Sequence, residues 1–189
     1  MDFGFPPAQH RTHEACGPGA CFFALAMAAR VGGQVLWAHE ARVREKLNPA
    51  GFGVYLDPAR LLVATAKDQT EVLAVAEEAL RSEALSLVVM ELTKPLGLTA
   101  GRRLQLAAKA GKSTALAIIP EGMGSNAAET RWHCTPAFDP SDSTLQCWRR
   151  IKNKSGTLGA WNVRWDAKAH CVTVVSPAGQ RPGSEGAPD

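Results

Sequence analysis

Four cationic side chains near residue 150 are the group in this sequence best suited to binding chemistry. They are Arg149, Arg150, Lys152 and Lys154, in the string WRRIKNK. Guanidinium and ammonium groups bind phosphate oxygens, so such a group could contact the backbone of a nucleic acid. Alternation along a strand predicts that Arg150, Lys152 and Lys154 share one face and form a cationic ridge there.

The stretch around this group, residues 131–168, holds the whole positive excess of the chain. The net charge is +3 at pH 7, and residues 1–130 contain equal numbers of basic and acidic side chains. The same stretch also contains most of the tryptophans, Trp132, Trp148, Trp161 and Trp165. Interleaved basic and aromatic residues are typical of nucleic-acid-binding surfaces, so weak, sequence-independent DNA binding is one interpretation. A solvated sheet face over a tryptophan-rich core is the other.

The histidines and cysteines do not form a recognisable metal or catalytic set. His10, His13, Cys16 and Cys21 are irregularly spaced, and no two cysteines have the C-x-x-C spacing. No cysteine has a legible histidine and aspartate to activate it. We therefore expect no metal, no catalytic residue and no disulfide framework.

Nothing in the sequence suggests a membrane segment. No run of about 18 apolar residues occurs, and the first residues lack a charged segment followed by an apolar one. We expect a cytoplasmic protein that does not associate with membranes.

The elements that would position these side chains follow an α/β pattern. Short apolar runs predict strands covered on both faces at residues 34–38, 61–65, 85–92 and 114–119. Helical periodicity predicts helices at residues 20–29, 71–81 and 99–110. Later alternating segments predict antiparallel strands at residues 130–137, 145–153, 159–166 and 170–175. We expect a mostly parallel sheet covered by helices, with a C-terminal antiparallel extension.

This pattern also predicts the domain organisation. Residues 1–178 would form one domain, because the antiparallel strands continue the sheet without a linker between them. Residues 179–189 have no apolar anchor and are predicted to be a disordered tail.

Several strings, taken in chain order, resemble the RecA family. Residues 11–29 resemble its first strand, phosphate loop and first helix, and residues 34–64 resemble the next strand, with Glu40 at the position of the catalytic glutamate. Residues 72–94 resemble its crossover helix and Walker B strand, with Glu91 in place of the magnesium-binding aspartate. Residues 150–166 resemble a late hairpin whose lysines match Lys152 and Lys154. The resemblance implies a RecA-like core.

The phosphate loop departs from that family. A Walker A loop needs G-x-x-x-x-G-K-[ST], because backbone amides cradle the phosphates, the lysine neutralises them and the hydroxyl holds magnesium. Here Phe22, Phe23 and Ala24 stand at the last three positions, and the phenylalanines are expected to fill the phosphate space. Ile119 and Pro120 replace the γ-phosphate sensor. We expect no enzyme activity, no cofactor and a vestigial nucleotide site made of Gly17, Pro18, Gly19, Phe22, Phe23, Glu40 and Glu91.

Two further departures concern RecA filaments. The segments at residues 92–103 and 121–129, which match the DNA-binding loops, are shorter than in the family. The chain also begins a few residues before the first strand, so we expect that the helix joining RecA subunits is absent and that its groove is free for a partner's helix.

Within this superfamily the chain is most similar to the ImuA family. The matching strings are His13-Glu14, Gly17 to Ala20, Leu36-Trp37, Leu56 to Val63, Glu77 to Arg81, Val88 to Leu92 and Thr130 to Trp132. This resemblance implies a non-enzymatic adaptor in SOS-induced translesion DNA synthesis, which acts with an ImuB-like Y-family polymerase homologue and an error-prone polymerase. A SulA-like inhibitor of cell division and an ATPase with an unorthodox loop are the alternatives.

Overall fold

A sheet of nine strands organises residues 3–177, the part of the chain that the computed structural model describes. The strand order is β3-β2-β4-β5-β1-β6-β7-β8-β9. The first six strands in this order are parallel, and β6 to β9 pair antiparallel. Their bounds are β1 (Thr12–Cys16), β2 (Gln34–Glu40), β3 (Leu61–Ala66), β4 (Leu85–Glu91), β5 (Thr114–Ile118), β6 (Thr130–Pro136), β7 (Gln146–Asn153), β8 (Gly159–Asp166) and β9 (Cys171–Pro177).

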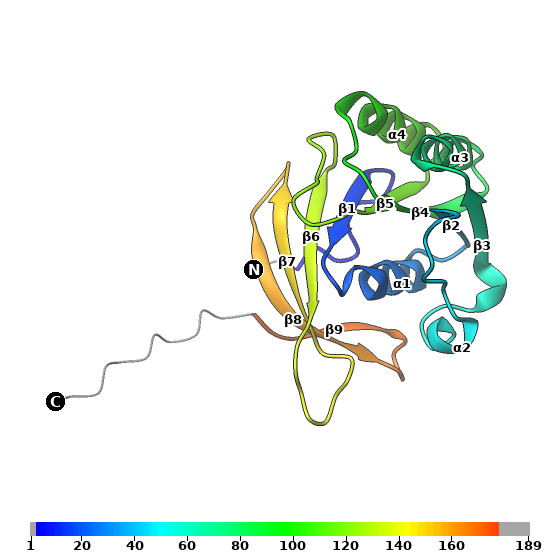
Figure 1. The fold of residues 1–189 in the computed structure, drawn as a ribbon. Coiled ribbons are helices and arrows are strands. Elements are labelled where there is room, and N and C mark those ends of the chain that lie inside the picture. Colours follow the sequence, from blue (N-terminus) through cyan, green and yellow to red (C-terminus); the bar gives the residue numbers. More distant parts are fainter. Residues whose placement is uncertain (1–2, 178–189) are drawn as a thin grey trace.

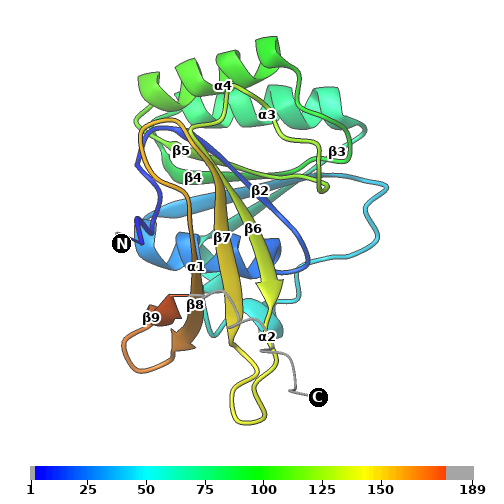
Figure 2. The ribbon, with the colours of Figure 1, turned by 90° about the vertical axis from the view of Figure 1, so that its left-hand side faces the viewer.

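Helices cover both faces of the parallel part (Figures 1 and 2). One face carries α1 (Ala20–Val31) and the short α2 (Pro49–Phe52), and a 3-10 helix spans Pro58–Arg60. The other face carries α3 (Gln69–Arg81) and α4 (Leu98–Ala110). The predicted α/β class, with parallel strands and an antiparallel extension, is confirmed.

Helices α1 and α3 differ in how much of their surface is buried. Helix α1 is apolar on nearly all sides because the sheet curls around it, so that β9 returns to contact it (Figure 1). Helix α3 buries only one stripe, Val72, Ala76 and Leu80, at the i, i+4, i+8 spacing. Its N-terminus is capped by Asp68, whose carboxylate accepts from the backbone amide of Glu71.

The predicted strands and long helices all exist, with ends that differ by a few residues. The prediction that residues 61–65 form a strand covered on both faces is wrong. These residues belong to β3, which is an edge strand, and its Leu62 and Val63 are 51% and 56% exposed. The strand predicted at residues 130–137 is β6, which is antiparallel to β7 but parallel to β1. The tail predicted at residues 179–189 lies outside the described residues.

The tryptophans form the core between α1 and strands β6 to β8. Trp132, Trp148 and Trp161 are at most 2% exposed, and the ring of Phe23 from α1 lies 4.7 Å from that of Trp148. These indoles contribute buried apolar area rather than a surface for stacking bases. The alternative of a tryptophan-rich core is therefore confirmed.

Buried polar pairs join β1 to β6, where the parallel part meets the antiparallel extension. The register places His13 beside Thr130 and Glu14 beside Arg131. Nδ1 of His13 bonds Oγ1 of Thr130 at 2.8 Å, and Nε of Arg131 donates to the Glu14 carboxylate at 2.7 Å. Glu14 is fully buried and also accepts from the amide of Ser125. A carboxylate in this position requires its cation.

Replacing Arg131 by Met should leave the Glu14 carboxylate buried without its cation. We expect a loss of about 3–5 kcal/mol in the free energy of unfolding, measured by urea denaturation. The double variant Glu14→Gln, Arg131→Met should recover most of that loss, because a neutral amide can still accept from Ser125. Losses that simply add in the double variant would contradict the coupling of this pair.

Candidate functional site

The carboxyl ends of the parallel strands bring the predicted nucleotide-site residues to one edge of the sheet. The loop from Gly17 to Gly19 follows β1, while Glu40 and Glu91 end β2 and β4. Ligands of open parallel sheets bind at the carboxyl ends of the strands, so this is the candidate ligand site of the fold.

The loop after β1 is closed by β6. The amide of Gly19 donates to the carbonyl oxygen of Cys134 at 2.8 Å. Gly17 has a φ of 87°, and a Cβ there would lie 2.6 Å from the same carbonyl. Only glycine therefore allows this approach. A backbone amide that would face a phosphate in a phosphate loop is bonded within the chain, and Pro18 between the two glycines is exposed.

The two phenylalanines of α1 point into the aromatic core. Phe23 is fully buried, with its ring 5.4 Å from Trp132 and 5.4 Å from Phe5. Phe22 is partly buried, and its ring lies 5.3 Å from Tyr55. These contacts hold both rings against the core, and the expectation that the rings fill a phosphate space stays a prediction. They occupy the space between α1 and the curled sheet.

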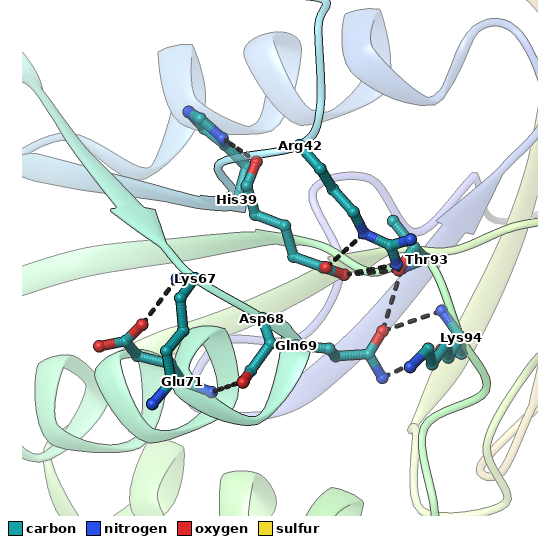
Figure 3. Close-up of polar contacts among 9 residues, drawn as sticks. His39, Arg42, Lys67, Asp68, Gln69, Glu71, Thr93 and Lys94 are labelled. Atoms are coloured by element: carbon teal, nitrogen blue, oxygen red, sulfur yellow. Dashed lines mark hydrogen bonds and ion pairs between the residues drawn. The ribbon is translucent and has the colours of Figure 1, made fainter.

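Arg42, Thr93 and Gln69 lie close together at the end of β2 (Figure 3). Glu40 is hydrogen-bonded within this polar cluster. Nε of Arg42 donates to its carboxylate at 2.6 Å, and the hydroxyl of Thr93 donates to its other oxygen. These hydrogen bonds from Arg42 and Thr93 lower the pKa of Glu40. Gln69, at the start of α3, accepts from the amides of Thr93 and Lys94 and so fixes the segment after β4. Both carboxylate oxygens of Glu40 therefore accept hydrogen bonds from within the chain.

Glu91 lies on the other face of the sheet from Glu40. The indole of Trp37 donates to its carboxylate, and Trp37 belongs to the core beneath α1. Glu40 instead meets the start of α3 through Thr93 and Gln69. A sheet separates the two carboxylates, so they cannot share one ion. Among residues 3–177, no three His, Cys, Asp or Glu side chains gather as a metal site would require.

The four cations near residue 150 are not on one face. A register shift lies between Arg131 and Trp132, so that Lys152 pairs with Arg131 but Arg150 pairs with Trp132. The extra residue, Ile151, reverses the alternation. The prediction that Arg150, Lys152 and Lys154 share one face is therefore wrong, because Arg150 points to the opposite face from the two lysines.

Each of these side chains also makes a contact within the chain. Arg150 is 7% exposed, lies 5.4 and 5.1 Å from the ring centroids of Trp132 and Trp161, and donates to the carbonyl of Thr157. Lys152 donates to the carbonyls of Ser125 and Ala128, and Lys154 to that of Ala127. Arg149 is exposed and bonds His133.

The partners of Glu40 were not predicted from the sequence. Arg42 follows it by two residues, and this spacing was a legible signal for a local ion pair. Thr93 comes from a different strand end, more than fifty residues away, and no local pattern pointed to it.

Comparison with known proteins gives two curated relatives. Both are named Protein ImuA, from Caulobacter vibrioides strains NA1000 / CB15N and ATCC 19089 / CIP 103742 / CB 15. Each is 34% identical over 159 residues, which cover 75% of this chain. The chain spans 64% of the length of these relatives. No family model matches it. None of the helices in the described residues has the length and apolar character to cross a bilayer.

Glu40→Gln should remove part of the acid sensitivity of the fold. The pKa of Glu40 is below its ordinary value of 4.5 in the folded protein, so its charge stabilises the fold above that value. This stabilisation is lost as the pH falls through the folded pKa. We therefore expect the urea midpoint of the wild type to fall more steeply between about pH 5 and pH 3 than that of Glu40→Gln.

The matched control is Glu78→Gln on the exposed face of α3. Its midpoint should fall with pH as steeply as that of the wild type. Equal slopes for the wild type and Glu40→Gln would show that the Arg42 and Thr93 contacts contribute nothing to stability.

Proposed function

This chain belongs to the ImuA family, and from that premise we propose that it is a non-enzymatic accessory protein of damage-induced mutagenesis. Its role would be that of an adaptor with a RecA-like fold in SOS-induced translesion DNA synthesis. The proposed partners are an ImuB-like Y-family polymerase homologue and an error-prone DNA polymerase, as the family resemblance implies.

The observation that carries the non-enzymatic part is the closure of the edge where a nucleotide would bind. The Gly19 amide is bonded to Cys134, and Glu40 is paired with Arg42 and Thr93. Phosphoryl transfer depends on positioned cations and donors around the phosphates. Here the position of the essential lysine is occupied by Phe23, which is buried in the core.

The order of elements supports the RecA-like part of the proposal. From β1 to β5 the chain runs strand, glycine-containing loop, helix and then further parallel strands with crossover helices. This is the order that the resemblance to the RecA family implies. The sheet and its helices persist while the catalytic groups do not, which favours a fold that serves as a binding surface.

We expect that millimolar MgATP does not raise the melting temperature of this protein. A bound nucleotide would stabilise the fold by about 2.7 kcal/mol at a hundredfold excess over its dissociation constant. Phe23→Lys should not create binding either, because it places an ammonium group in the aromatic core. A RecA-type ATPase measured in parallel serves as the positive control. A clear thermal shift of the wild type would overturn the non-enzymatic proposal.

The adaptor role is tested by co-purification with the ImuB-like protein encoded in the same genome. We expect the two proteins to be retained together, whereas an active Y-family polymerase from that genome, used as the control bait, should not be retained. Retention of the cell-division protein alone, with its polymerisation blocked, would replace the mutagenesis role with that of a SulA-like inhibitor.

A further inference from the structure

A groove on the outer side of α4 exposes apolar side chains that no other described element covers. It encloses about 440 Å³ between α4, the segment after β5 and the end of β7. Leu98 and Leu106 are 47% and 63% exposed along it. The lining residues are Leu98, Arg102, Gln105, Leu106, Asn126, Ala127 and Lys154. Exposed leucines in a concave site are typical of a surface that binds another molecule.

The wall of this groove opposite α4 is held rigidly. Gly101 allows the wall to pack on the helix, because a Cβ there would lie 2.7 Å from Cβ of Ala127 and 3.0 Å from Oγ of Ser125. The buried Glu14 accepts from the amide of Ser125, and Lys152 donates to its carbonyl. A site whose walls are fixed before binding loses little entropy when a partner docks.

The groove is cationic on both sides. Helix α4 contains Arg102, Arg103 and Lys109 and no acidic residue. Arg103 pairs with Glu77 of α3, whereas Arg102 makes no hydrogen bond or ion pair with any described residue. On the facing wall, the Lys154 ammonium donates to the carbonyl of Ala127 and has further N–H groups available. Within residues 3–177, no acidic side chain lines the groove to neutralise these charges.

We propose that this groove is the docking site for an acidic amphipathic helix of a protein partner. Leu98 and Leu106 are eight residues apart on α4, or about 12 Å along its axis, which matches two apolar side chains two turns apart on a docked helix. Glutamates or aspartates beside those anchors would pair with Arg102 and Lys154.

Two other occupants fit the groove less well. A nucleic acid would satisfy the cations but would leave the leucines without apolar contacts. The segment of this chain after residue 177 contains Glu185 and Asp189 but no large apolar side chain to anchor it. The observations therefore favour a separate protein.

This inference deepens the proposed adaptor function, on which it rests for the existence of a protein partner. The probe is a synthetic helical peptide of about 14 residues with leucines at i and i+7, flanked by glutamates. The matched probe has lysine in place of every glutamate. Binding is measured from amide chemical shifts of the isotope-labelled full chain.

We expect the glutamate peptide to give saturable shifts in α4 and residues 125–127 at up to about 1 mM, and the lysine peptide to give none. Arg102→Glu should weaken binding about tenfold or more, by loss of one charge pair and addition of a repulsion. Leu106→Glu should do the same by removing an anchor. Lys168→Glu, an equal charge change in the turn between β8 and β9, should bind as the wild type does.

Three results would overturn the proposal. They are no saturable shift with the glutamate peptide, equal binding by Arg102→Glu, and shifts in the same residues caused by an oligonucleotide but not by the peptide. None of these results decides the adaptor role, because the co-purification experiment tests that role separately. Retention of the ImuB-like protein by wild type and Arg102→Glu alike would place that partner elsewhere on the molecule.

Discussion

The buried pair between Glu14 and Arg131 is the interaction on which much of this structure depends. It joins β1 to β6, and these strands are the link between the parallel part of the sheet and the antiparallel extension. The carboxylate of Glu14 also orders Ser125, and Arg131 donates to the carbonyl of Ser125. Because a buried charge without its partner costs several kcal/mol, this pair constrains the strand register and the loop after β5 together.

The curled sheet explains the interleaving of basic and aromatic residues. Strands β6 to β9 bend around α1, so their inner face must supply large apolar side chains, and the tryptophans do so. Arg150 lies among them because its guanidinium stacks over two indoles and donates to backbone carbonyls. In this setting a cation stabilises the core. The part of this pattern made by Arg150 and the tryptophans is thus an internal arrangement of one cation and aromatic rings.

The carboxyl ends of the parallel strands and the outer side of α4 differ in the groups that they leave free to contact another molecule. At the edge, the loop amide and both oxygens of Glu40 are bonded within the chain, and the sheet separates Glu40 from Glu91. Along α4, leucines and Arg102, which is unpaired among residues 3–177, face solvent beside a fixed wall. This difference supports the proposal that the surface along α4 binds a partner.

The sequence alone determined the elements, because hydrophobic periodicity is a local property. The stripe of Val72, Ala76 and Leu80 predicted α3, and the apolar run at residues 85–92 predicted β4, each to within a few residues. The missing lysine at Phe23 was also legible without a structure, and so was the loss of the hydroxyl at Ala24.

Only the tertiary structure decided where the charged groups point and what they bind. One bulge residue, Ile151, sends Arg150 to the core and Lys152 to the opposite face, although a simple alternation placed them together. Thr93 reaches Glu40 from 53 residues away along the chain, and Arg131 reaches Glu14 from 117 residues away. Such contacts depend on strand order and register, which long-range packing selects. A pattern read along neighbouring residues contains no information about them.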